Sequence, residues 1–150
     1  MGSSLTNLLY HLVFSTKMRV DLITPNLAQD LYPYLGGIIR AEKGILLTIG
    51  GTANHAHLLA KFHPTVSVSN MLQQIKGSSS KWINDGQRAP GHFAWQTGYG
   101  AFSVSESSVA AVTQYIEIQA EHHQHQTFQA ELVTLLQKHG IPYDERYLWD

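Results

Sequence analysis

The stretch ILLTIGGTANHAHLLAKF, residues 45–62, contains two apolar runs separated by a few small or polar residues. The first run, ILLTIGG (45–51), is rich in β-branched and apolar residues and ends in two glycines. The second run, HAHLLAKF (55–62), begins almost at once. Such runs are typical of β-strands, and so short a connection joins antiparallel neighbours. The stretch therefore predicts an antiparallel hairpin near the middle of the chain.

Apolar spacing and helix-capping residues predict six further elements around this hairpin. They are a strand at 8–16, helices at 24–44 and 67–85, a strand at 98–105, and helices at 106–123 and 127–140. Pro33, the pair Gly36–Gly37 and Gly77 predict interruptions in the first two helices. The order β-α-β-β-α-β predicts an α+β fold of the ferredoxin-like or RRM-like split type, a four-stranded antiparallel sheet plus two C-terminal helices.

Length and composition limit the class of protein. We expect one domain over residues 1–150 with its own core, and we expect residues 1–6 to be disordered or part of an added tag. Cysteine is absent, which excludes disulfides and thiolate metal sites. No apolar run reaches the roughly 18 residues of a membrane span, and no signal peptide is recognisable. We therefore expect a cytoplasmic protein with no membrane partner.

The charges are distributed unevenly along the chain. Residues 1–90 carry eight Lys or Arg against four acids, a net charge of +4, whereas residues 91–150 carry two against seven, a net charge of −5. A basic half is compatible with a partner that bears phosphates. With so few charges, chance segregation explains the pattern equally well.

Two histidines stand one residue apart at the start of the second hairpin strand. Side chains at i and i+2 of a strand project from the same face, so we expect His55 and His57 to lie side by side. Two neutral imidazoles placed in this way can bind one divalent cation. So short a pattern also fits two ordinary histidines near a strand end. Metal-dependent amidohydrolases carry the same motif, but their barrel requires about 250 residues.

Tyr115 and Gln119 are four residues apart in the helix predicted at 106–123, so they share one face of it. A phenol one helical turn from an amide oxygen is a nucleophile beside a potential metal ligand. The spacing fits equally well a tyrosine packed on the sheet and a glutamine in solvent. The histidines that follow lack the i, i+4 spacing of paired ligands, and we interpret them as a solvated helix end: His122, His123 and His125.

Seven stretches, in order and over nearly the whole chain, resemble the IS200/IS605-type transposases, the single-tyrosine members of the HUH endonuclease superfamily. They are YHLVFSTKMRVDLIT, LGGIIR, GGTANHAHLLAKF, SVSNMLQQIKGSSSKWI, FAWQTGYGAFSVS, YIEIQAEHH and HGIPYDERYLWD. His55-Ala56-His57 is similar to the His-hydrophobic-His motif of that family. Tyr115 and Gln119 match its catalytic tyrosine and the glutamine ligand four residues later.

The sequence departs from the family pattern in two places. Ala56 is smaller than the Val or Ile expected between the two histidines, and Asn54 replaces a common acidic residue before the first of them. Neither change removes a ligand, although both bear on metal affinity and rate.

The resemblance implies an enzyme, a metal-dependent single-strand DNA endonuclease and strand transferase that cuts and rejoins DNA at insertion-element ends. It implies that His55, His57 and Gln119 hold Mg²⁺ or Mn²⁺ and that Tyr115 forms a 5′-phosphotyrosine intermediate. The expected partners are single-stranded DNA with hairpins and a second copy of the chain, in a homodimer whose active sites are completed in trans. Such a protein would lie in the cytoplasm, at the nucleoid when bound to DNA.

Several basic and aromatic residues are candidates for contact with DNA. Lysines and arginines suit phosphates, and a tryptophan, Trp82 or Trp95, suits stacking on a base. The candidates are Lys17, Arg19, Lys76, Lys81 and Trp82. Solvated lysines and core tryptophans are equally compatible with the sequence. Two other functions stay open, namely a domesticated relative that processes chromosomal repeats and a nucleic-acid-binding module without catalysis.

Overall fold

The structure is a computed structural model, and it describes residues 2–119 and 126–149. Its centre is a four-stranded sheet in the order β2-β3-β1-β4, in which every neighbouring pair is antiparallel. The strands are β1 (Leu8–Ser15), β2 (Ile45–Gly51), β3 (His55–Phe62) and β4 (Gly100–Val104). The predicted four-stranded antiparallel sheet and the hairpin of β2 and β3 are confirmed.

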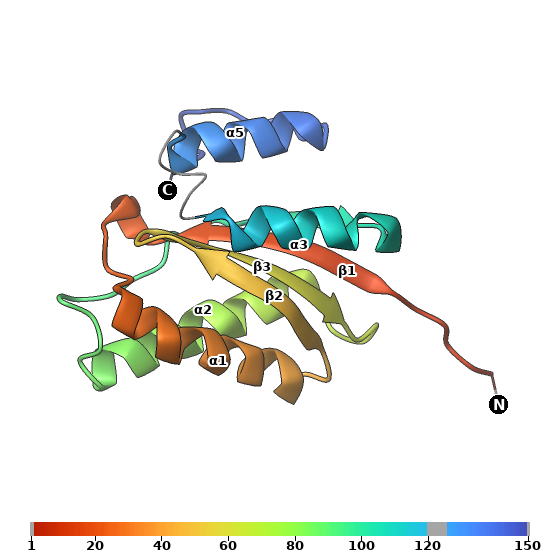
Figure 1. Ribbon diagram of the computed structural model, residues 1–150, viewed down its shortest axis with the longest axis horizontal. Helices are drawn as coiled ribbons and strands as arrows, with labels where there is room; N and C mark the ends of the chain where they lie inside the picture. Colours follow the sequence, from red (N-terminus) through yellow and green to blue (C-terminus); the bar gives the residue numbers. More distant parts are fainter. Residues whose placement is uncertain (1, 120–125, 150) are drawn as a thin grey trace.

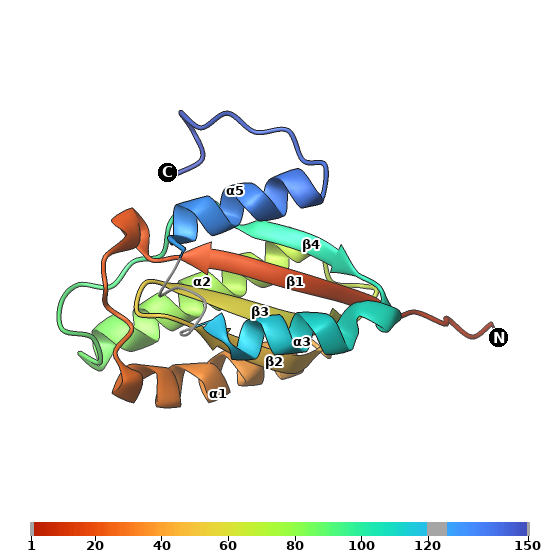
Figure 2. The ribbon, with the colours of Figure 1, turned by 45° about the horizontal axis from the view of Figure 1, so that its top comes forward.

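Helices cover both faces of this sheet (Figure 1). One face carries α1 (Pro25–Ala41) and α2 (Val68–Asp85), and the other carries α3 (Val109–Glu117) and α5 (Phe128–Lys138). Figure 2 shows α5 along β1 and β4, and α3 along β2 and β3. Two short 3₁₀ helices, η1 (Lys17–Arg19) and η2 (Glu106–Ser108), follow β1 and β4. The α+β fold is therefore the predicted ferredoxin-like arrangement with additional C-terminal helices.

Strand alternation sends side chains into two separate cores. The larger core lies between the sheet and the helices α1 and α2, where Phe14 and Leu58 are fully buried. The smaller core lies on the other face, where Val13 and Phe102 pack against the apolar side of α5. Because β3 is the second strand of the sheet and is covered on both faces, its histidines are removed from solvent.

The helix boundaries agree with the capping residues, but the predicted interruptions are wrong. Thr24 caps α1 by accepting a hydrogen bond from the Leu27 amide. The helix nevertheless runs unbroken past Pro33 and its two glycines, and α2 runs unbroken past Gly77. Packing explains this result, because every third or fourth residue of α1 is buried against the sheet and outweighs weak local propensity.

The predicted helix at 106–123 is divided into η2 and α3. Among the apolar residues of α3, Ile116 is fully buried, whereas Val109 and Val112 are only partly buried. The proposed solvated helix end falls outside the described residues, and it comprises His122, His123 and His125. Within the part of the chain that is described, no helix is long and apolar enough to cross a bilayer.

Candidate metal and nucleophile site

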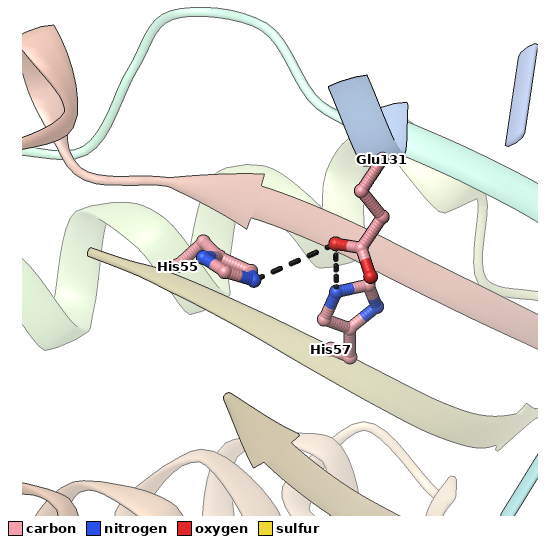
Figure 3. A group of neighbouring side chains, drawn as sticks. All are labelled: His55, His57 and Glu131. Atoms are coloured by element: carbon pink, nitrogen blue, oxygen red, sulfur yellow. Dashed lines mark hydrogen bonds and ion pairs between the residues drawn. The ribbon is translucent and has the colours of Figure 1, made fainter. Parts of the chain in front are cut away.

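The two histidines of β3 lie side by side, as strand alternation predicts, and point toward Glu131 of α5 (Figure 3). His55 and His57 are 1% and 0% exposed. Their Nε2 atoms both approach one oxygen, Oε1 of Glu131, at 3.5 and 2.9 Å. The three residues each offer a ligand atom within 4.8 Å of the others, which is the clustering that a metal ion requires.

Glu131 comes from α5 and is absent from the residues predicted by sequence. Thr127 caps this helix by accepting from the Ala130 amide, and the first turn then presents Phe128 and Glu131 to the sheet. In the sequence, Glu131 is distinguished only by its place beside Leu132 on the apolar side of the helix, where an acid is seldom buried. The signal does not indicate a partner, because 74 residues separate Glu131 from His57.

The outer nitrogens of both histidines are also occupied. His55 Nδ1 lies 2.7 Å from Asn54 Oδ1 and 2.9 Å from Thr52 Oγ1. A hydrogen on Nδ1 donated to the amide oxygen leaves Nε2 as the unprotonated ring nitrogen, on the side of Glu131. Asn54 therefore supplies an oxygen acceptor to this nitrogen without adding a negative charge.

His57 has a corresponding outer partner on the neighbouring strand. Its Nδ1 lies 2.8 Å from Nε2 of His11, which is buried on β1. Burial, reinforced by the nearby imidazole of His57, lowers the pKa of His11 to about 3. His11 is therefore neutral at physiological pH and can accept a hydrogen bond from His57. A carboxylate only accepts, so in the 2.9 Å contact with Glu131 the hydrogen lies on Nε2 of His57, whereas the tautomer that donates from Nδ1 to His11 leaves Nε2 for a cation.

Tyr115 reaches the same cluster from α3. Its hydroxyl donates to Glu131 Oε2, and its ring meets the His57 ring edge-on with centroids 5.7 Å apart. Burial, then the hydrogen bond and negative charge of Glu131, raise the pKa of Tyr115 well above its usual value. The phenol is therefore held neutral in this arrangement.

A glycine in β2 allows α3 to lie this close to the sheet. A Cβ on Gly50 would collide with the backbone carbonyl oxygen of Ile116, the residue after Tyr115. The hydroxyls of Thr48 and Thr113 also meet across this contact, at 3.4 Å. The absence of a side chain at position 50 thus sets how near Tyr115 comes to the histidines.

Gln119 lies two residues beyond the end of α3, past its C-cap Ile118, and not on the helical face predicted to hold it with Tyr115; it is 1% exposed. Its Nε2 donates to the Tyr115 carbonyl oxygen at 3.0 Å. Its Oε1 is buried and has no hydrogen-bond partner in the described part of the chain. Leaving such an oxygen unsatisfied costs about 1–3 kcal/mol, so a cation or its bound water would relieve the cost.

The donor set fits a divalent cation. Two imidazole nitrogens and a carboxylate oxygen form a mixed nitrogen and oxygen donor set of the kind that binds divalent ions. The outer partners Asn54 and His11 can each accept a hydrogen bond in the tautomers that ligation needs.

The residues predicted to contact DNA lie in two places. Lys76 and Lys81 line one cleft of about 630 Å³ between α2 and residues 92–99. Lys76 donates to the carbonyls of Thr97 and Gly98, each at 3.0 Å, and partial burial lowers its pKa. Lys81 instead pairs with Asp85 in the same helix, at 2.7 Å.

The aromatic and N-terminal candidates are engaged elsewhere. Trp82 stacks on Tyr34 with ring centroids 4.3 Å apart, and the Arg88 guanidinium lies 4.2 Å from its ring. Trp95 is buried and donates to Ser79 at 2.9 Å, which supports the core interpretation for that residue. Two basic candidates, Lys17 and Arg19, belong to η1, and the second of them contacts the C-terminal segment at the carbonyl of Trp149.

Comparison with known proteins adds an independent line of evidence. The model of a family described as "Transposase IS200 like" matches residues 4–119. The ISDra2 transposase TnpA of Deinococcus radiodurans is 27% identical over 116 residues, which cover 73% of this chain and 82% of that protein. The matched family region ends at Gln119, so α5 and Glu131 lie beyond it.

Two solved structures share the fold. A chain from Deinococcus radiodurans R1 assigned as a transposase superposes with a TM-score of 0.63 at 26% identity, covering 79% of this chain and 95% of that one. A REP-associated tyrosine transposase bound to a REP hairpin gives a TM-score of 0.63 at 12% identity, covering 82% and 72%. The second likeness concerns the fold alone.

Proposed function

Because the chain belongs to the IS200-like transposase family, we propose that it cleaves and rejoins single-stranded DNA at insertion-element ends with Tyr115 as the nucleophile. One observation carries this proposal: the Tyr115 hydroxyl and the Nε2 atoms of both histidines converge on the same buried carboxylate, Glu131. A phenol at that position stands beside a cluster that could hold a cation. A phosphodiester attracted by that cation would therefore lie next to the phenol.

The proposed chemistry is a transesterification. The Tyr115 oxygen bonds to phosphorus, the bond from phosphorus to the 3′-oxygen breaks, the phenol loses its proton, and the departing oxygen gains one as a 3′-hydroxyl. The resulting 5′-phosphotyrosine keeps the energy of the broken diester. A different 3′-hydroxyl can then reverse the step without ATP, which is the requirement for strand exchange.

The chain's own residues prepare this step. Glu131 accepts the phenolic hydrogen bond and so fixes the direction of the Tyr115 oxygen. His55 and His57, with Gln119 as predicted and Glu131 as a further ligand, would hold the cation. Mg²⁺ or Mn²⁺ bound there supplies positive charge that polarises the scissile phosphate. Loss of one ligand should weaken binding of the ion without unfolding the sheet.

We further propose that the DNA hairpin docks in the α2 cleft, and that the protein acts as a homodimer. Support for the first part is the basic lining of the cleft by Lys76 and Lys81.

The dimer with exchanged α3 helices follows from the family resemblance, whereas in the single chain α3 brings Tyr115 to its own histidines. Mixing Tyr115→Phe with His57→Ala subunits distinguishes the two arrangements, because only exchange of helices restores one intact site.

The decisive experiment uses labelled single-stranded oligonucleotides from the element ends, incubated with the protein and Mn²⁺ and separated on denaturing gels. We expect a covalent adduct that disappears in Tyr115→Phe. His57→Ala should also abolish the adduct while hairpin binding stays largely intact. Binding without any adduct would instead indicate a non-catalytic module, and an adduct formed only with chromosomal repeats would indicate a domesticated relative.

A further inference from the structure

We infer that a groove between α3 and α5 binds the nucleotide that becomes linked to Tyr115, an inference that rests on the proposed function. The groove has a volume of about 550 Å³ and lies on the face of the sheet opposite the α2 cleft. This volume falls within the roughly 300–1,000 Å³ typical of sites for small organic ligands. It is therefore large enough for one nucleotide unit.

The groove is continuous with the nucleophile. Tyr115 and His11 both line it, and His11 is the outer partner of His57. A nucleotide in the groove would therefore lie against the tyrosine, beside β1 and β4. The α2 cleft lacks this property, because neither Tyr115 nor a histidine of the β3 pair is among its lining residues.

The chemistry of the lining suits a nucleotide. Val112 and Leu135 supply apolar surface for a base, and Ser105 and Ser108, whose hydroxyl oxygens lie 3.1 Å apart, supply hydroxyl donors. Lys138, exposed at the end of α5, supplies positive charge for a phosphate. No Asp or Glu is found among the described residues that line the groove. An anionic ligand would thus meet a cation and hydroxyls without a repelling carboxylate at the walls.

An aromatic platform stands at the same end of α5. His139 lines the groove, and its ring stacks on Phe102 with centroids 4.5 Å apart and an interplanar angle of 19°. The stacked pair holds the imidazole in a fixed orientation beside Lys138. A rigid ring next to a cation is the combination that single-stranded nucleic acids favour.

The order of bond changes indicates which nucleotide occupies the groove. Between cleavage and rejoining, the nucleotide whose 5′-phosphate is bonded to Tyr115 must stay in place, whereas the strand that ends in the 3′-hydroxyl must be exchanged. A groove lined by Tyr115 itself is suited to the retained nucleotide. Because α5 lies beyond the matched family region of residues 4–119, this wall of the groove is contributed by the chain's own C-terminal part.

Crosslinking gives a direct test. The Tyr115→Phe protein is bound to an element-end oligonucleotide that carries 5-iodouracil as the first base 3′ of the scissile phosphate, irradiated, and mapped by mass spectrometry. We expect crosslinked peptides from α3, β4 or the end of α5. Crosslinks confined to the α2 cleft would overturn the inference.

Binding of a short strand that spans the cleavage site and lacks the hairpin, measured in EDTA, gives a second test. Lys138→Ala should weaken binding about tenfold and reduce the salt dependence by about one phosphate contact. Ala111→Trp, on an exposed position of α3 that lines the groove, should fill it and block binding. Lys43→Ala is the matched control, because it removes the same charge from the turn between α1 and β2.

The outcomes separate this inference from the proposed function. A wild-type protein that forms no Tyr115 adduct with any element-end strand would refute the proposed function. A wild-type adduct combined with Lys138→Ala and Ala111→Trp proteins that bind like Lys43→Ala would refute only the role of the groove.

Discussion

The substitution Gly50→Ala tests whether the close contact between β2 and α3 positions the nucleophile. An added Cβ would lie 3.2 Å from the carbonyl carbon of Ile116 and closer still to its oxygen. The obstacle is backbone, so no side-chain rotation relieves it. Because ordinary contact begins near 3.4 Å, α3 must move outward by about 1 Å.

A shift of that size has two consequences of different magnitude. Crowding of a packed site costs about 1–3 kcal/mol of unfolding free energy, which the fold can tolerate. A displacement of about 1 Å between a nucleophile and its target can slow the reaction about 100-fold. Tyr115 immediately precedes Ile116, so it moves with the helix. We therefore expect a large loss of rate with a modest loss of stability.

The assay compares the rate of covalent adduct formation with the urea midpoint of the same protein. Gly37→Ala is the control, because a Cβ at that position in α1 meets nothing within 4 Å. It should leave the rate unchanged and raise stability by about 0.5–1 kcal/mol. A Gly50→Ala protein that forms the adduct within twofold of the wild-type rate would refute the positioning role of this contact.

Three further predictions concern the charged and titrating groups of the site. Glu131→Gln should weaken Mn²⁺ binding at least tenfold in calorimetry, since it removes the only carboxylate among the described residues of the cluster. The control Glu145→Gln changes an exposed acid in the same half of the chain, and this protein should bind the ion like the wild type. The unfolding free energy should fall as the pH drops from 6.5 toward 3. The pKa of His11 is about 3 in the folded protein, so the imidazole of His11 binds its proton in the unfolded chain at a higher pH than in the folded one. The slope from this group is at most about 1.4 kcal/mol per pH unit. His11→Gln should remove that part of the slope in urea titrations at several pH values, and an unchanged slope would show that His11 is not the group responsible. Glu131→Gln should also lower the pKa of Tyr115 toward that of a free phenol, because it removes a negative charge that disfavours the phenolate; difference absorbance against Tyr115→Phe measures it, and an unchanged or higher pKa would contradict the contact.

Local signals were sufficient for most of the fold. The predicted runs 45–51 and 55–62 coincide with β2 and β3, because apolar strand residues and flanking glycines are properties of neighbouring residues. The two interrupted helices were the main error. Pro33 and Gly77 carry a local cost that only tertiary packing offsets, and a sequence pattern does not contain that packing energy.

The candidate site divides in the same way. Strand alternation placed His55 beside His57, and the helical repeat together with the family resemblance selected Tyr115 and Gln119; their roles stay predictions. Glu131 could not be found by these means, although its two carboxylate oxygens contact the side chains of His55, His57 and Tyr115.

By itself the sequence determined the order of elements, the paired histidines and the membership of the family, because each depends on residues close together along the chain or on similarity along it. Only the tertiary structure decided that α5 brings a carboxylate under the tyrosine, that His11 lies 2.8 Å from His57, and that a groove opens beside them. Those contacts join residues 16 to 74 positions apart. These contacts exist because both faces of the sheet must be covered. The burial of apolar surface that selects the covering helices is non-directional, so the periodicity of the sequence does not reveal which helix packs on which face.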